Sequence, residues 1–270
     1  MNRTQVGGGR GGNGVRILIG LVVAAFSFFS YLGSQEYNPI TGENQYISMT
    51  VEQEISLGQQ SAPQLIQEFG GLFPDEEVQD AIDVIGNRLV NNSIASNTPW
   101  QFEFHVLNDR NTINAFALPG GQVFITTALL SRFDSADQVA GVLSHEIVHV
   151  LARHSAQRIA QNELTNGLVG AVGVASGDAS ASQTAAMVAQ LVNMQYGRSD
   201  ELESDTLGVC LMLDAGYDPE AMIDVMNVLA EASGGAQQPE FFSTHPNPQN
   251  RIQEIEEAIA NASQDCPSVR

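Results

Sequence analysis

The chain has 270 residues, enough for one catalytic domain and an anchor, and its hydrophobic content of 43% is ordinary for a folded protein. Its formal net charge is −20, and all 11 basic residues are arginines. Three of them (Arg3, Arg10 and Arg16) precede an apolar segment, which leaves −23 on the remainder; so acidic a surface excludes nucleic acid as a partner and would repel an anionic membrane surface.

The N-terminal region divides into three segments. Residues 1–15 are a basic, glycine-rich tail, residues 16–33 are a membrane anchor or signal segment, and residues 34–49 are a polar linker. The uncharged apolar run from Ile17 to Leu32 is short, because about 20 residues cross a bilayer. We interpret it as an uncleaved anchor, with a cleaved signal peptide as the alternative, since no convincing small-residue cleavage site follows. Arginines before the run and acids after it place the rest of the chain outside the cytoplasm.

Residues 50–265 are predicted to form one domain. Apolar periodicity and capping residues predict helices at 50–69, 75–91, 134–162, 198–215, 219–232 and 247–260, and alternation predicts strands at 100–107, 114–118 and 123–126. Thr50 and Gln53 match a capping box, whereas Pro63 is expected to kink or break that first helix. Asn247 and Pro248 are expected to begin the last helix as its cap and first residue.

Two further features of the domain carry specific expectations. Residues 163–195 are small and apolar, and we interpret them as two short helices around Gly177 that would serve as a mobile flap, too broken for a second membrane span. Cys210 and Cys266 permit one disulfide, but Cys210 lies in an apolar helical run, and a buried free thiol is the favoured interpretation. Their positions do not resemble zinc-ligand spacing.

The most informative stretch reads His-Glu-Ile-Val-His from His145 to His149. Positions four apart share a helix face, so these two imidazoles can hold one metal ion together. Neutral imidazoles suit zinc, and Glu146 beside an open coordination position can act as a general base. The alternative is a helix whose histidines merely cap it or pair with carboxylates. His154 is turned off the metal face by its spacing, and it and His105 are interpreted as structural.

Two imidazoles rarely hold zinc durably, so a third ligand is expected downstream, where Glu201 and Asp205 stand one helical turn apart. We predict that Glu201 is the third ligand and that Asp205 accepts the free ring N–H of a zinc histidine, which would fix its tautomer. Glu203 points elsewhere on the same helix. Without the upstream histidines, Asp205 would be interpreted as a solvated carboxylate.

Four segments together resemble the HtpX-like and CAAX-protease-like family of membrane-associated zinc metallopeptidases, gluzincins with two histidines and one glutamate on the metal. The segments are Asn114–Gly121, Gly141–Val150 with Ala152-Arg153-His154 behind it, Arg198 with Glu201, Asp205 and Gly208, and Ser243–Pro246 with Arg251-Ile252. By layout they are most similar to bacterial envelope members with one catalytic domain. The multi-span barrel of the CAAX proteases is absent, so prenyl-peptide processing is not expected.

The pattern and the resemblance indicate an α+β, zincin-type metallopeptidase domain, mostly helical with a small sheet beside the active-site helix, and one Zn²⁺ per chain. The resemblance places His245 near the metal, as an oxyanion donor or as a resting-state zinc ligand. Arg198 is expected to support the ligands, and Arg198 and Tyr196 are further candidate oxyanion donors. The substrate is expected to bind along an edge strand formed by Asn114, Ala115, Phe116 and Ala117, with an ordinary interior strand as the alternative.

The expected function is zinc-dependent hydrolysis of peptide bonds in unfolded or misassembled envelope proteins, with Glu146 accepting a proton from the attacking water. A membrane-tethered, chaperone-like binding factor that retains a zinc site is the main alternative, although a purely structural site would not need Glu146. A second alternative is a soluble protease secreted to the periplasm after signal cleavage. The expected location is the bacterial inner membrane, with the catalytic domain in the periplasm.

Overall fold

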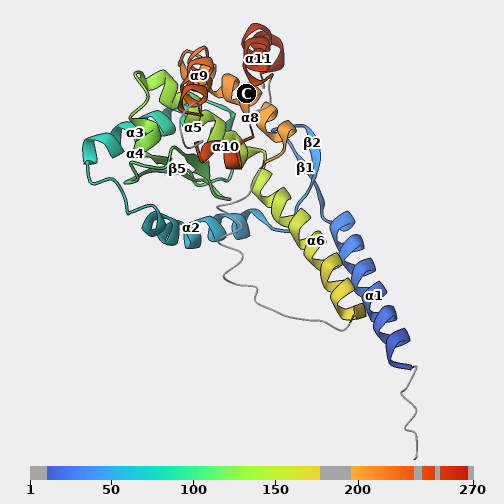
Figure 1. Ribbon diagram of the computed structural model, residues 1–270. Helices are drawn as coiled ribbons and strands as arrows, with labels where there is room; N and C mark the ends of the chain where they lie inside the picture. The colour runs from blue at the N-terminus through green and yellow to red at the C-terminus, as the bar shows by residue number, and fades with distance from the viewer. Residues whose placement is uncertain (1–10, 177–195, 234–238, 247–249, 267–270) are drawn as a thin grey trace, which may run out of the picture.

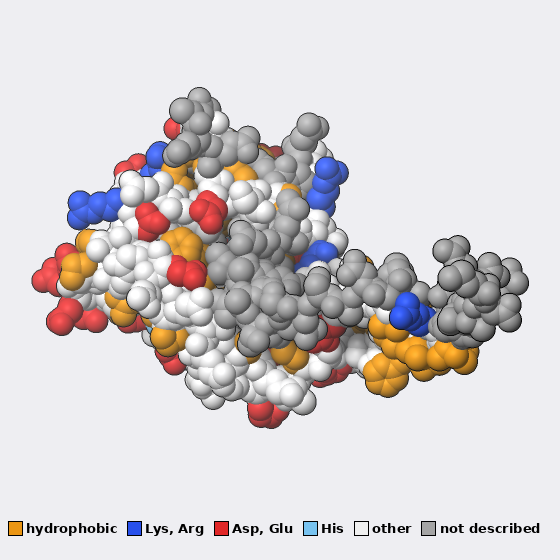
Figure 2. Space-filling view, turned by 60° about the horizontal axis from the view of Figure 1, so that its bottom comes forward, with side chains coloured by type: hydrophobic (Ala, Val, Ile, Leu, Met, Phe, Trp, Pro, Cys, Tyr) orange, Lys and Arg blue, Asp and Glu red, His pale blue; other side chains and the backbone are white. Residues whose placement is uncertain are grey.

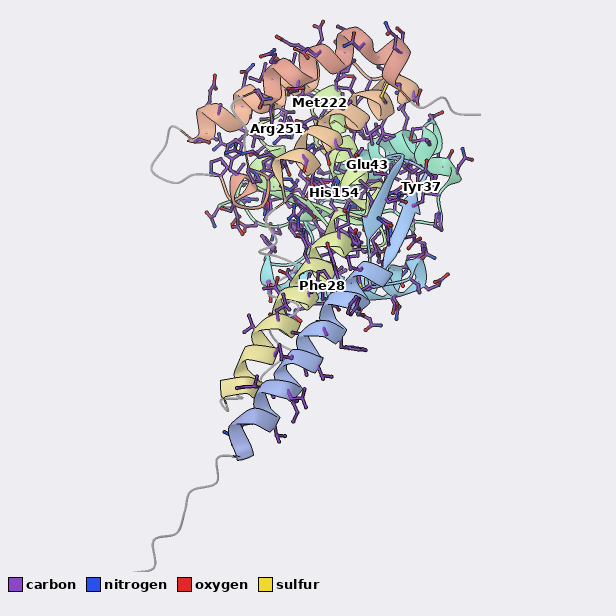
Figure 3. The ribbon with its side chains drawn as sticks, turned by 90° about the vertical axis from the view of Figure 1, so that its right-hand side faces the viewer. Phe28, Tyr37, Glu43, His154, Met222 and Arg251 are labelled. Carbon is purple, nitrogen blue, oxygen red and sulfur yellow. A yellow bond between two sulfur atoms is a disulfide. The ribbon has the colours of Figure 1, made fainter. Side chains whose placement is uncertain are left out.

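A computed structural model describes residues 11–176, 196–233, 239–246 and 250–266 (Figure 1). A mostly helical domain carries an arm of two helices, α1 (Gly11–Gly33) and α6 (His154–Ser176), which lie side by side in both ribbon views (Figures 1 and 3). Within these described residues, the stretch Gly14–Gly33 of α1 is long and apolar enough to cross a membrane, with a mean hydropathy of 2.1. The predicted α+β class is confirmed.

The domain is built from helices around two small sheets. Its helices are α2 (Val51–Glu68), α3 (Glu76–Asn91), the 3₁₀ helix η1 (Ile94–Asn97), α4 (Thr127–Leu130), α5 (Ala136–Leu151), α8 (Arg198–Ala215), α9 (Ala221–Ser233), α10 (Phe241–Thr244) and α11 (Arg251–Asp265). Strands β1 (Gln35–Asn38) and β2 (Glu43–Tyr46) form an antiparallel hairpin. Strands β3 (Glu103–Leu107), β4 (Ala115–Ala117) and β5 (Gln122–Thr126) form a mixed sheet in the order β3-β5-β4, with β3 parallel and β4 antiparallel to β5.

The mixed sheet lies between α2 and α5, and its central strand β5 is buried on both faces (Figure 1). Val123 and Ile125 join the main core with α5, whereas Phe124 belongs to a second cluster with Leu65 of α2. Phe124 also stacks on Phe116 of β4 at a ring distance of 4.9 Å. A run of apolar residues buried on both faces is what a covered central strand requires. The sheet is therefore a rigid surface on which α5 packs.

The turn between β4 and β5 depends on two glycines. Gly120 has φ +84° and Gly121 has φ +121°, values that residues with a side chain rarely adopt. A Cβ atom on Gly120 would also lie 2.3 Å from the Ile55 Cα, and one on Gly121 would lie 2.4 Å from the Gln101 carbonyl oxygen. Glycines at both positions thus let α2 pack directly onto the turn and fix the end of β4.

Several local predictions agree with the structure, but the helix predicted at 134–162 is wrong. Helix α2 begins with the expected capping box, and Pro63 lies within it without ending it. The predicted active-site helix is instead two helices, α5 and α6, separated at Arg153, which has φ 55°. The last carbonyls of α5 bond to buried side chains of the hairpin, since Asn38 Nδ2 donates to Leu151 O at 2.9 Å and Gln45 Nε2 donates to Ala152 O at 2.9 Å.

Three other predictions concern residues 34–49, residues 163–195 and the start of the last helix. The 34–49 segment forms the β1–β2 hairpin instead of a linker, because its polar strands pack against the end of α5 and not against an apolar face. Up to Ser176, the region expected to hold two short helices continues α6 without a break. The remainder of that region and the predicted cap at Asn247 and Pro248 lie outside the described residues.

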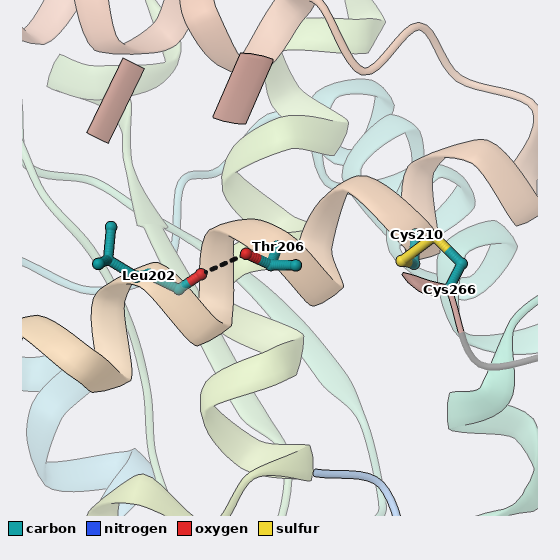
Figure 4. Close-up of a disulfide and its surroundings, with 4 residues drawn as sticks. All are labelled: Leu202, Thr206, Cys210 and Cys266. Carbon is teal, nitrogen blue, oxygen red and sulfur yellow. Dashed lines mark hydrogen bonds between the residues drawn. A yellow bond between two sulfur atoms is a disulfide. The ribbon is translucent and has the colours of Figure 1, made fainter. Parts of the chain in front are cut away.

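The expectation of a free thiol at Cys210 is also wrong. Cys210 and Cys266 form a disulfide with an S–S distance of 2.05 Å that joins α8 to the end of α11 (Figure 4). The reason is tertiary: α11 packs on α8 and brings together two residues separated by 56 positions. Helical periodicity around Cys210 indicates burial but says nothing about which residue lies opposite.

Candidate metal centre

Helix α5 provides the first part of the site. The Nε2 atoms of His145 and His149 lie 3.1 Å apart on its buried face. Glu146 is fully buried beside them, and neither of its carboxylate oxygens has a hydrogen-bond partner among the described residues. Burial raises the pKa of Glu146 above its ordinary value. A carboxyl group with these properties is suited to accept and return a proton.

Two other segments complete a cluster with these imidazoles. Glu201 of α8 places its carboxylate oxygens 3.5 Å from His145 Nε2 and 3.6 Å from His149 Nε2. His245, directly after α10, places its Nδ1 atom 3.3 Å from His145 Nε2 and 3.1 Å from Glu201 Oε1. One donor atom from each of the four residues lies within 4.8 Å of all the others.

The spacing of this cluster is compatible with a bound metal ion. Zinc–nitrogen distances of about 2.0–2.1 Å imply distances of about 3.3 Å between neighbouring ligand atoms of a tetrahedron. The five separations given above, which involve both carboxylate oxygens of Glu201, range from 3.1 to 3.6 Å, and one donor set from the four residues lies within 4.8 Å. Glu201 Oε2 is moreover buried without a hydrogen-bond partner among the described residues, as expected for an atom that binds a metal. Two or three imidazoles with one carboxylate form a donor set that zinc accepts.

A buried ion pair between Asp205 and Arg251 contacts the candidate ligands His145 and Glu201. Asp205 Oδ1 lies 2.9 Å from His145 Nδ1, in the position predicted from the sequence. Arg251 of α11 donates to both oxygens of Asp205, at 2.7 and 2.6 Å, and its Nη1 lies 3.0 Å from Glu201 Oε2 without hydrogen-bond alignment. Burial alone would lower the pKa of His145, but Asp205 and Glu201 raise it to about 9. These contacts orient the His145 ring and make it a more basic ligand.

Sequence reasoning missed the role of Arg251 and, although it placed His154 off the metal correctly, did not predict the contact of His154 with His149. His154 Nδ1 lies 2.9 Å from His149 Nδ1, and its Nε2 lies 2.9 Å from Glu203. On one straight helix, His154 would point away from His149, but the break at Arg153 turns the chain and brings the two rings together. Both Arg251 and His154 stand in segments that carried the family resemblance, which was the available signal.

The structure does not bring Arg198 to the cluster. Arg198 is exposed at the first turn of α8 and makes no hydrogen bond or ion pair with the cluster among the described residues. The guanidinium beside Glu201 and Asp205 belongs to Arg251 instead, because α11 and not the start of α8 faces them. The Tyr196 ring packs on His149 at 3.9 Å, while its hydroxyl pairs with Ser155 Oγ at 2.9 Å.

The residues predicted to bind substrate lie at an edge of the mixed sheet. Asn114 O and Leu118 N bond to β5, so the intervening Ala115 and Ala117 direct their backbone groups to the other side. Among the described residues those groups have no backbone partner. Asn114 is buried, and its Oδ1 atom has no hydrogen-bond partner there either. The strand therefore lies at the edge of the sheet, but Ala115, Phe116 and Ala117 are buried, at 0%, 8% and 6% exposed.

Comparison with known proteins identifies the family. Residues 76–259, which include every residue of the cluster, match Peptidase family M48. This chain belongs to peptidase family M48. The M48 domain described here is accordingly a metal-dependent protease, and its cluster of three histidines and one glutamate is where such a metal would bind.

Individual M48 relatives come from bacteria and mitochondria. The chain is 31% identical over 246 residues to the beta-barrel assembly-enhancing protease of Yersinia pestis, covering 87% of this chain and 50% of that protein. It is 31% identical over 244 residues to the protein of that name from Escherichia coli strain K12, covering 87% and 48%. It is 30% identical over 248 residues to the mitochondrial metalloendopeptidase OMA1 of Schizosaccharomyces pombe, covering 91% and 72%. The chain thus spans about half the length of the bacterial relatives.

Proposed function

We propose that this M48 peptidase is a zinc-dependent endopeptidase with one zinc ion per chain, held by His145, His149 and Glu201. The observation that carries the proposal is a compact set of metal donors with Glu146 buried beside it and without a hydrogen-bond partner among the described residues. A zinc site with a purely structural role is closed by its ligands and needs no free carboxylate. Bound zinc would polarise the scissile carbonyl and lower the pKa of the attacking water.

Four residues around the cluster have separate roles in the proposed reaction. Glu146 accepts the proton of the attacking water and returns it to the leaving amine. His245 supplies the fourth donor of the cluster at rest, and its Nε2 lies 3.5 Å from Glu146 Oε1. When the substrate carbonyl enters, His245 moves off that position and donates a hydrogen bond to the oxyanion. Asp205 and Arg251 hold His145 in one orientation throughout.

The proposed substrate is an unfolded or misassembled polypeptide of the cell envelope. Its backbone would pair with the edge strand β4 once the substrate displaces what buries that strand, a mode of binding that needs an extended segment and little sequence specificity. The name of the bacterial relatives, which refers to beta-barrel assembly, supports a substrate of this kind.

The proposed location is the bacterial inner membrane, with α1 as an anchor and the catalytic domain in the periplasm. The apolar helix and the arginines before it support this orientation. The Cys210–Cys266 disulfide supports it independently, because such bonds persist in oxidising compartments and are rare in the cytosol.

The decisive variant is Glu146→Gln, tested on the purified full chain with fluorescently labelled casein as an unfolded substrate. It should abolish cleavage while native mass spectrometry still detects one zinc per chain, because the amide cannot accept the proton and is not a ligand. Glu201→Ala should lose both zinc and activity, and the exposed Glu163→Gln serves as the control. Full activity in zinc-loaded Glu146→Gln would refute the mechanism. A chaperone-like factor would suppress aggregation equally in wild type and Glu146→Gln.

The substrate class requires a separate measurement. Proteomics of envelope fractions should show proteins that accumulate in cells with Glu146→Gln and are shortened in cells with the wild-type enzyme. An unchanged envelope proteome would remove this part of the proposal and leave the peptidase assignment intact.

A further inference from the structure

The arm formed by α1 and α6 is held together by small side chains. The least exposed positions of α1 recur with helical spacing and are Gly20, Val23, Ala24, Ser27 and Tyr31. From Leu164 onward, those of α6 whose burial is described are Leu164, Gly167, Ala171 and Val174. Each helix thus turns one narrow stripe, rich in Gly, Ala and Ser, toward the other. Stripes of this kind allow close backbone approach, which is how helices associate inside membranes.

One contact fixes how the two helices are aligned. A Cβ atom on Gly167 would lie 2.2 Å from Ser27 Oγ, so Gly167 sits directly against Ser27. The helices run antiparallel (Figure 3), and residues that follow Gly167 therefore lie level with residues that precede Ser27. Val169 is consequently level with the middle of the apolar run Ile17–Leu32, and not with its end.

The outer face of α6 at this level is uncharged and exposed, with Leu168 and Val169 beside the polar Thr165 and Asn166. Among the described residues, Leu168 is 40% exposed and Val169 is 65% exposed. No charged residue occurs from Leu164 to Ser176, although the chain as a whole is strongly acidic. Figure 2 shows hydrophobic side chains gathered on the projecting arm and acidic ones spread over the domain. Helix α1 also exposes apolar side chains at this level, since Phe26 is 74% exposed.

We propose that the distal part of α6, from Leu164 to Ser176, lies inside the lipid bilayer beside α1. The proposal rests on the assignment of α1 as the anchor: a helix packed along the middle of a span must share its depth. At 1.5 Å per residue this part of α6 is about 20 Å long, so it enters the roughly 30 Å hydrocarbon core without crossing it. Lipid covers the exposed face of α6, because the exposed surface of α1 beside it carries the same kind of apolar side chains.

The consequence for the active site is a short, rigid connection to the membrane. Helix α6 begins at His154, whose ring contacts the ligand His149. Ten helical residues separate His154 from Leu164, which corresponds to about 15 Å. The catalytic centre is therefore held close to the bilayer surface, and the polypeptides within its reach are membrane-embedded or membrane-adjacent ones.

Depth-dependent fluorescence quenching tests the proposal. Single cysteines are introduced in the full chain, whose native cysteines are disulfide-bonded, at Val169, at Val22 of α1 and at Val84 of α3, which are 65%, 61% and 66% exposed. Each protein is labelled with an environment-sensitive dye and reconstituted into phosphatidylcholine vesicles that contain nitroxide-labelled acyl chains. Retained peptidase activity on a soluble peptide verifies folding, and Leu168→Cys provides a second position on α6.

The expected result is similar quenching at Val169 and Val22, severalfold stronger than at Val84. Quenching at Val22 but not at Val169 or Leu168 would overturn the proposal and leave the anchor in place. Absence of quenching at all positions would overturn the anchor and the proposal together. None of these outcomes depends on the zinc mechanism, which the Glu146→Gln experiment tests separately.

Discussion

Removing the Cys210–Cys266 disulfide is expected to lower the free energy of unfolding by about 4 kcal/mol. The bond joins positions 56 residues apart, and cross-linking a loop of that size restricts the unfolded chain by about this amount at 25 °C. Domains are typically stable by only about 5–15 kcal/mol, so the loss would be a large fraction of the total. The closed loop also contains His245 and Arg251, and its loosening should weaken zinc binding.

The assay is urea unfolding of the full chain in detergent, followed by far-ultraviolet circular dichroism. Wild type is measured with and without dithiothreitol, beside a Cys210→Ala/Cys266→Ala variant under the same two conditions. The reduced wild type reports the loss of the cross-link without any change of side chain, and zinc affinity is measured in parallel by competition with a chelating dye. The variant should be insensitive to dithiothreitol and should match the reduced wild type to within the cost of trimming the buried Cys210 side chain.

A decrease of less than about 1 kcal/mol in the reduced wild type would refute this reasoning. It would mean that contacts between α8 and α11, above all those of Arg251, already restrict the loop in the unfolded ensemble. Unchanged zinc affinity in the reduced protein would likewise show that the position of Arg251 does not depend on the bond at the far end of α11.

Further outcomes concern the site and its surroundings. His245→Ala should lower turnover by roughly a hundredfold while zinc is retained, as for loss of an oxyanion donor, and increased basal cleavage would show instead that masking dominates. His154→Ala should weaken zinc affinity by roughly 10–100-fold in a chelator competition, and Glu203→Ala by less, because Glu203 bonds to His154 and is one residue further from the ligand His149. Burial raises the pKa of Glu54 from its ordinary value of 4.5 to about 7, despite its ion pair with Arg153. The folded state then binds more protons than the unfolded chain between those values, so stability should fall as pH rises through this window, and Glu54→Gln should flatten that slope in urea titrations.

Local sequence signals predicted much of this structure. The cap of α2 and the boundaries of α8 depend on neighbouring residues, and both agree with the structure. The same holds for His145 and His149, because their common face follows from helix geometry alone. The partners of these residues come from four different segments of the chain, and Glu201 was predicted only because zinc chemistry requires a third donor.

What could not be predicted depends on contacts between distant segments. Arg153 has no sequence feature that requires φ 55°; its conformation is held by Glu54 and by the hairpin that binds the end of α5. That single break decides where His154 lies. The pairing of Cys210 and the position of Arg251 both follow from the packing of α11 on α8, which no local pattern records.

The β1–β2 hairpin connects α1 mechanically to the metal cluster. It follows α1 directly, and Tyr31 of α1 stacks on Tyr46 of β2 at 4.6 Å. Asn38 and Gln45 donate hydrogen bonds to the end of α5, the helix that carries His145 and His149. If α1 is embedded as proposed, the hairpin would hold the metal cluster at a fixed distance and tilt relative to the membrane. A peptidase held in this way would select a peptide bond by its distance from the membrane more than by the residues around it.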